Sequence, residues 1–174
     1  MIAQGFGIIG MALAIYSFQC KRNKWFFVFQ ALSGLMFSLN FLLLPVPALG
    51  AALFNLTNIV RGALFSKSDR VKWKLILNLV LYTGCTLVGL YFVRGDGLQI
   101  FLNLLTSAAC MAGTVAMWTG NGAFIRKMQF FCCSPFWLVH NCFNFSLGGI
   151  LCESFNMLSV VISFLRYGKD GFEK

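Results

Sequence analysis

Charged residues are scarce in this sequence, and acidic ones most of all. Asp, Glu, Lys and Arg make up 11% of the 174 residues, and only 5 residues are acidic, whereas 59% are hydrophobic. A soluble domain of this length needs a polar shell around its core, and this composition cannot supply one. We therefore expect lipid to be the solvent for most of the chain.

The sequence also lacks the motifs of metal and enzyme chemistry. Its 7 cysteines are odd in number, include no CxxC pair and have no zinc spacing with the single histidine, which argues against disulfides and against a metal site. No Gly-x-Ser-x-Gly elbow or Walker A sequence occurs, so we expect no enzyme activity, no catalytic residues and no cofactor. The net charge of +9 forms no basic stripe, so we expect no nucleic-acid partner.

Long apolar runs are what the sequence does have. About 20 apolar residues cross the hydrocarbon of a bilayer as a helix. Seven such runs cover about residues 2–18, 25–44, 48–65, 73–93, 98–118, 128–143 and 150–167. We expect the last turn at Gly148–Gly149, and Pro135 should kink or loosen the sixth helix. No basic residue precedes the first run, so we expect it to be a membrane span and not a cleavable signal.

The basic residues fall on alternate sides of these runs. The gaps after the first, third and fifth runs and the C-terminal tail hold all but one of the 14 Lys and Arg residues, when Arg61 is counted with the gap that follows it. The exception is Arg94. Because Lys and Arg collect on the cytoplasmic side of a membrane, this pattern predicts a multi-pass protein with its N-terminus outside and its C-terminus in the cytoplasm.

An internal repeat divides the chain into two similar halves. After a shift of 101 positions the aligned polar pairs are Ser33 and Ser134, Asn40 and Asn141, and Asn55 and Asn156. One linker helix between two units of three lets both units insert in the same orientation, which is a transporter architecture. We therefore predict an all-α integral membrane protein of seven transmembrane helices: two parallel three-helix bundles, residues 1–67 and 97–174 with a short cytoplasmic tail, joined by a linker helix within 68–96.

This layout resembles the SWEET and PQ-loop transporters. In that superfamily the second helix of each unit carries a Trp-x-x-Tyr-Gly-like element, and the third carries an Asn that faces the pore. The segment WLVHN at residues 137–141 is similar to that element, and Asn55 and Asn156 are similar to the paired Asn. The resemblance implies a pore between the two units.

A second resemblance is closer and extends over most of the chain. The segment FCCSPFWLVHN at residues 131–141, followed by SLGG at 146–149 and by Glu153, resembles the YgjV family of bacterial inner-membrane proteins. This resemblance implies that the protein lies in the bacterial inner, or cytoplasmic, membrane.

Two titratable residues stand out within the apolar runs. Glu153 is the only acidic residue inside a run, and His140 is the only histidine. Because ionisable groups are expensive in lipid and usually functional there, we expect this pair to carry or sense a proton. The alternatives are a structural carboxyl bonded to the Gly148–Gly149 turn and a buried, hydrogen-bonded histidine.

Four asparagines and a tryptophan complete the candidate site. Asn55, Asn156, Asn40 and Asn141 lie on polar stripes at helical spacing, and we expect them to hydrogen-bond a solute while Trp137 stacks on it. The alternative for each Asn is a bond between neighbouring helices. The alternative for Trp137 is packing or anchoring at the membrane interface.

These observations predict passive or proton-linked transport of a small solute by alternating access, in which the two units rock about a site near the membrane midplane. The solute is a sugar, a nucleoside or another polar metabolite. The expected partners are that solute and the lipid bilayer, and a homo-oligomer is left open. The other function classes are a membrane receptor or binding protein on the same scaffold, and an accessory protein whose asparagines only hold helices together.

Overall fold

The computed structural model describes residues 1–18, 23–65 and 70–167, and within them the chain forms helices and no strand. The elements are α1 (Ile2–Phe18), α2 (Asn23–Leu42), α3 (Leu49–Phe65), α4 (Lys72–Phe92), α5 (Gly97–Thr119), α6 (Gly122–Met128), the π-helical segment η1 (Gln129–Cys133), α7 (Ser134–Phe143) and α8 (Leu147–Tyr167). Because α6, η1 and α7 follow one another without a break, the described part contains seven helical rods. The expectation of an all-α chain is confirmed.

The predicted turn at Gly148–Gly149 is wrong. Both glycines lie inside α8, and the chain turns before them, at Phe145, which has a positive φ of 53°. The amide of Ser146 bonds the carbonyl of Asn141 at 3.0 Å across this turn, as in a Schellman end of a helix. The glycines serve close packing instead, which a sequence pattern does not distinguish from a turn.

The sixth rod begins earlier than its apolar run. Gly120 adopts the left-handed conformation at the end of α5, and the side chain of Asn121 caps α6 by accepting a bond from the amide of Phe124 at 3.1 Å. Arg126 and Lys127, expected in a gap between helices, are therefore part of α6. Almost two turns of helix, which include Arg126 and Lys127, therefore precede the apolar run.

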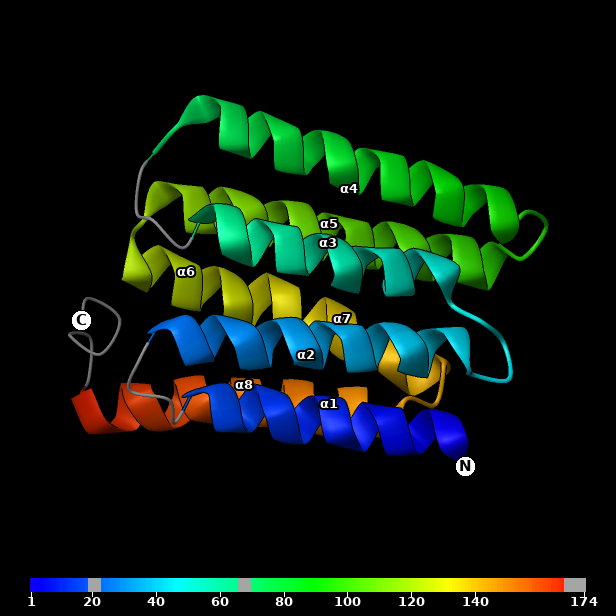
Figure 1. The fold of residues 1–174 in the computed structure, drawn as a ribbon, viewed down its shortest axis with the longest axis horizontal. Helices are drawn as coiled ribbons and strands as arrows, with labels where there is room; N and C mark the ends of the chain where they lie inside the picture. The colour runs from blue at the N-terminus through cyan, green and yellow to red at the C-terminus, as the bar shows by residue number, and fades with distance from the viewer. Residues whose placement is uncertain (19–22, 66–69, 168–174) are drawn as a thin grey trace.

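Six of the rods form a closed ring. Figure 1 shows all the helices running along one axis, with α4 at one edge of the molecule. In the first half α2 packs against α1 and α3, and in the second half α7 packs against α5 and α8. The ring closes where α1 meets α8 and where α3 meets α5, and α4 packs outside it against α3 and α5. The three rods before α4 and the three after it thus have the same order of helix contacts.

The outside of this bundle is apolar. On α4, Trp73, Val80 and Phe92 are each more than half exposed, and only 17% of the most apolar window of this helix is buried inside the protein. Soluble monomers rarely expose continuous apolar surface on this scale. By length and mean hydropathy, two helices of the described chain are able to cross a membrane, α4 at 1.8 and α5 at 1.7, and shorter apolar stretches occur at Ile2–Ser17, Val28–Leu42, Leu49–Phe65 and Leu147–Ile162.

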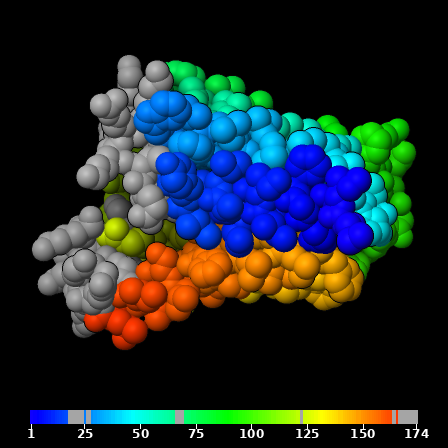
Figure 2. All heavy atoms as spheres, turned by 60° about the horizontal axis from the view of Figure 1, so that its bottom comes forward, coloured from blue at the N-terminus to red at the C-terminus, as the bar shows by residue number. Residues whose placement is uncertain are grey.

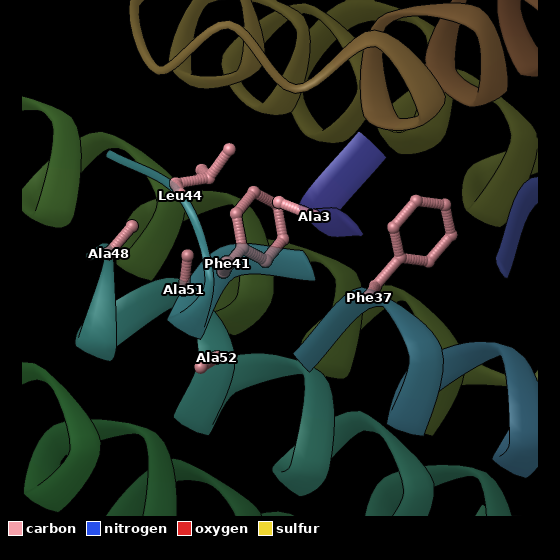
Figure 3. Close-up of a cluster of buried hydrophobic side chains, with 7 residues drawn as sticks. All are labelled: Ala3, Phe37, Phe41, Leu44, Ala48, Ala51 and Ala52. Atoms are coloured by element: carbon pink, nitrogen blue, oxygen red, sulfur yellow. The ribbon is translucent and has the colours of Figure 1, made fainter. Parts of the chain in front are cut away.

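Small and aromatic side chains fill the interior of the ring near the end where the N-terminus lies. The cluster comprises Ala3, Phe37, Phe41, Leu44, Ala48, Ala51 and Ala52. Figure 3 shows Ala3 of α1 directed at the ring of Phe41 on α2. Trp137 of α7 packs against this cluster and also against a second one, made of Phe54, Tyr82 and Cys110, so one indole joins the two buried cores.

Several of the basic residues counted in the gaps lie outside the described residues. They are Lys21, Arg22, Lys67, Lys169 and Lys174. The boundary between residues 67 and 68, placed between the first unit and the linker, falls in the same undescribed part, and α4 occupies Lys72–Phe92 of the predicted linker.

The two halves approach most closely where α1 meets α8. Figure 2 shows the two helices in contact along one face of the molecule. A Cβ atom added at Gly148 would overlap the backbone of Gly7, so glycine is required here to let the helices touch.

We expect Gly148→Ala to lower the thermal unfolding temperature of the detergent-solubilised protein, because the added methyl forces α1 and α8 apart at a cost of about 1–3 kcal/mol. The control is Gly5→Ala, since a Cβ at Gly5 meets nothing within 4 Å. Equal unfolding temperatures for the two variants would contradict the close approach.

Candidate functional site

A chain of hydrogen bonds surrounds the carboxyl of Glu153 on α8. The hydroxyl of Ser134 donates to Oε2 of Glu153 at 2.6 Å, and Nδ2 of Asn156 donates to the same oxygen at 3.3 Å. Nε2 of Gln129 in turn donates to Oγ of Ser134 at 2.9 Å. The carboxyl is therefore held by the sixth rod and by its own helix, and not by the Gly148–Gly149 segment.

The π-helical segment η1 places Ser134 in this position. Pro135 has no N–H and cannot continue the α-helical bonding pattern, and the preceding turn is wider: the amide of Ser134 bonds the carbonyl of Gln129, five residues back. The expectation that Pro135 loosens this helix is confirmed. Single π turns inside α-helices are frequent at functional sites, and this one brings the buried Ser134 to the only carboxyl within the apolar runs.

A half-buried arginine lies on the other side of η1. Arg61 of α3 points into the bundle, where its Nη1 donates to the carbonyl of Cys110 at 3.3 Å and its guanidinium lies 5.9 Å from the centre of the Tyr82 ring. The hydroxyl of Tyr82 donates to Oδ1 of Asn58 at 2.6 Å. The prediction counted Arg61 with the cytoplasmic gap and did not place its side chain inside the bundle. The spacing of Arg61 from Asn58 nevertheless puts both residues on one face of the helix.

The Cys133–Ser134 segment separates the arginine from the carboxyl. A Cβ at Gly113 of α5 would be 3.1 Å from Nη1 of Arg61 and 3.3 Å from Sγ of Cys133, so these two atoms border the same space. The next residue, Ser134, bonds Glu153. Within the described residues Arg61 and Glu153 form no direct ion pair. The guanidinium of Arg61 and the carboxyl of Glu153 lie on either side of the short helical stretch at Cys133 and Ser134.

The predicted asparagines divide into two kinds. Nδ2 of Asn55 donates to the carbonyl of Ala51 in its own helix at 2.9 Å, and Asn156 donates to Glu153, also in its own helix. Neither of these side chains bonds a neighbouring helix in the described structure. Asn55 and Asn156 are half-buried.

Asn40 belongs to the second kind, because its side chain joins helices. It donates to the carbonyl of Ala3 in α1 at 2.7 Å and accepts from the hydroxyl of Ser146, before α8, at 2.6 Å. Gln4 adds two bonds, to the carbonyl of Phe145 and from the amide of Leu147. The two Asn40 bonds are buried and the two Gln4 bonds are exposed, and together they join α1, α2 and the segment before α8 at this end of the ring.

His140 and Asn141 lie near the same end and are both buried. The imidazole of His140 makes edge contacts with the rings of Phe41, at 5.3 Å, and Trp137, at 5.6 Å. Its Nδ1 and the Oδ1 of Asn141 have no hydrogen-bond partner in the described structure. The described residues show no bond between His140 and Glu153, so the structure does not bring the predicted proton-handling pair together directly.

Trp137 lies between His140 and the aromatic core. Its ring is 5.9 Å from that of Phe41, at an interplanar angle of 32°. Among the described residues, no group of three or more His, Cys, Asp or Glu side chains is placed to hold a metal ion.

Comparisons with known proteins point to one family. The model of the Imp-YgjV family, described as a bacterial inner membrane protein, matches residues 1–170. The chain is 29% identical over 184 aligned positions to the inner membrane protein YgjV of Escherichia coli strain K12. The alignment covers 99% of this chain and 89% of that protein. No solved structure matches.

Replacing Ser134 by Ala should destabilise the protein by about 1–3 kcal/mol, because the variant leaves the half-buried carboxyl of Glu153 without its shortest hydrogen bond. Ser154→Ala is the matched control, since the hydroxyl of Ser154 bonds a carbonyl of its own helix on the exposed face. Thermal unfolding in detergent measures both variants, and a Ser134→Ala protein as stable as the control would rule out this bond.

Proposed function

Because the chain belongs to the Imp-YgjV family of bacterial inner membrane proteins, we propose that it is a small-solute transporter that crosses this membrane seven times and works by alternating access. The two three-helix units are α1–α3 and α5–α8, with α4 as the linker. The N-terminus lies outside and the C-terminus in the cytoplasm.

The distribution of polar groups supports this topology. Fully buried residues include Asn40, Asn78, Thr106, Thr114 and Ser134, whereas large apolar side chains cover the exterior. Such an inverted pattern suits a bundle whose solvent is lipid. The ends of the helices gather at two ends of the molecule (Figure 1), and α5 and α6 meet at the end opposite the α4–α5 turn.

The contrast between Asn40 and the pair Asn55 and Asn156 is the observation that carries the proposal. At the end where the N-terminus lies, Asn40 locks α1, α2 and the segment before α8 together. Nearer the middle of α3 and α8, Asn55 and Asn156 bond only their own helices. Side chains of that kind are free to exchange those weak local bonds for bonds to a solute. This suits a transporter closed on the outside and ready to bind from the cytoplasm.

Glu153 and His140 are the groups we assign to proton handling. Glu153 accepts from Ser134 and Asn156, so a change in its protonation alters bonds on two helices. His140, with an unpaired Nδ1 among aromatic rings, occupies the closed half. Trp137, which contacts both Phe41 and His140, is placed to contact the solute as the closed half opens.

The bonds of Asn40 also favour a second candidate, an accessory protein or receptor in which the asparagines are purely structural. For Asn40 itself this interpretation agrees with the geometry, because its side chain joins two other segments. The structural interpretation does not extend to Asn55 and Asn156. A measurement of whether these two residues contribute to solute flux distinguishes a transporter from an accessory protein or receptor.

We expect epitopes inserted at Gly95 and at Asn121 to lie on opposite sides of the membrane. An epitope at Gly95, in the α4–α5 turn, should bind antibody on intact spheroplasts. One at Asn121, in the α5–α6 turn, should bind only after permeabilisation. Equal accessibility at both positions would contradict the proposed topology.

Flux measurements on reconstituted protein test the transport proposal. Liposomes would be offered glucose, uridine, alanine and succinate, with and without a pH gradient. The double variant Asn55→Leu/Asn156→Leu should remain folded and lose most of the flux, whereas Asn40→Leu should lower the unfolding temperature, because it leaves Ser146 and Ala3 unpaired. Full flux in the double variant, or no flux of any solute by the wild type, would reject the proposal.

A further inference from the structure

Arg61 is a half-buried cation that forms no ion pair with a carboxylate among the described residues. Its guanidinium has five N–H donors, and one of them bonds the carbonyl of Cys110 at the long distance of 3.3 Å. The Tyr82 ring, 5.9 Å away, provides a weak attraction. Among the described residues no Asp or Glu side chain forms an ion pair with it. A cation inside a membrane protein costs several kcal/mol unless something balances it.

The arginine does not extend towards the membrane surface, although its place in α3 would allow that. It lies four residues before the end of α3, within reach of the interface for a long side chain. Its guanidinium nevertheless points across the bundle, to Cys110 and Gly113 of α5 and towards Cys133 of η1. This inward direction separates Arg61 from basic residues that only set orientation.

Resting on the proposed transport function, we propose that the solute is a small carboxylate, such as a hydroxy acid or an amino acid, and that Arg61 binds its carboxylate group. A guanidinium matches a carboxylate with two parallel hydrogen bonds. One guanidinium balances one negative charge, which favours a monocarboxylate end over a phosphate dianion.

The space beside Arg61 is bordered by α3, α5 and η1. A Cβ at Gly113 of α5 would be 3.1 Å from Nη1 of Arg61 and 3.3 Å from Sγ of Cys133. Glu153 bonds Ser134, the next residue of the sixth rod, and we assign the carboxylate to the Arg61 side alone. A sugar lacks the charge that would compensate Arg61, so the arrangement selects carboxylates over neutral solutes.

Binding to the purified full-length protein tests this assignment by calorimetry. The probes are L-lactate, L-alanine, methyl lactate, glucose, choline and inorganic phosphate. We expect L-lactate or L-alanine to bind, with a Kd raised about tenfold or more by Arg61→Gln, as loss of a charge-assisted bond requires. Arg61→Lys should be intermediate, because it keeps the charge and loses the planar fork.

Arg94→Gln is the matched control. Arg94 also lies over a tyrosine ring, 4.0 Å from the centre of Tyr91, and its Nε also bonds a carbonyl, that of Tyr91 at 3.1 Å, but it is exposed in the α4–α5 turn. This variant should leave Kd unchanged. If Arg61→Gln does not fold, binding to the wild type decides. The assignment is overturned if methyl lactate binds as tightly as L-lactate. It is also overturned if only glucose, choline or phosphate binds, or if none of the probes binds.

The flux assay separates this inference from the transport proposal. Binding of L-lactate or L-alanine that depends on Arg61, without flux of either, would remove transport and keep the carboxylate site. Flux of glucose without carboxylate binding would remove the site and keep transport.

Discussion

Polar groups inside a helical bundle with an apolar exterior must find partners within the protein, and most of this structure follows from that constraint. Asparagine, serine and threonine side chains turn inwards and bond backbone carbonyls or one another, as Thr86 does with Ser107 at 2.6 Å. Leucine, isoleucine and phenylalanine are left on the outside. A closed ring of six helices satisfies this demand with two similar units, because each unit alone would leave one polar face unpaired.

The polar contacts are not spread evenly along the ring. Near the N-terminal end of α1, short bonds from Asn40 and Gln4 connect segments far apart in the chain. Beyond the aromatic residues Phe41 and Trp137, bonds between helices continue: Ser33 of α2 donates to the carbonyl of Gly10 in α1, and Tyr82 of α4 donates to Asn58 of α3. Asn55 and Asn156 differ from these side chains, because each bonds only within its own helix.

The sequence predicted the helices well, but it did not predict which residues of different helices contact one another. Apolar runs of span length give each of the described rods, because burial in lipid leaves little choice of structure. Gly148 was interpreted as part of a turn. A glycine in a sequence does not show whether it allows the chain to bend or allows a distant helix, here α1 at Gly7, to pack closely against it. Arg61, at the end of the third run, was counted with the gap that follows it, because the positive-inside count places a charge at the nearest boundary. The bond from Ser134 to Glu153 depends on the extra residue of a π turn, which local propensity does not encode.

The two related halves differ chemically at a pair of aligned serines. Adding 101 to the last residue of α2 gives the last residue of α7, so Ser33 and Ser134 lie the same number of residues before the ends of these helices. Ser33 bonds a backbone carbonyl of α1, whereas Ser134 reaches a carboxyl. Ala52 stands where the shift of 101 positions would place a match for Glu153, so the first half offers no carboxyl at the equivalent position. A proton taken up by Glu153 therefore has no equivalent acceptor there, and the two halves cannot exchange roles in holding it.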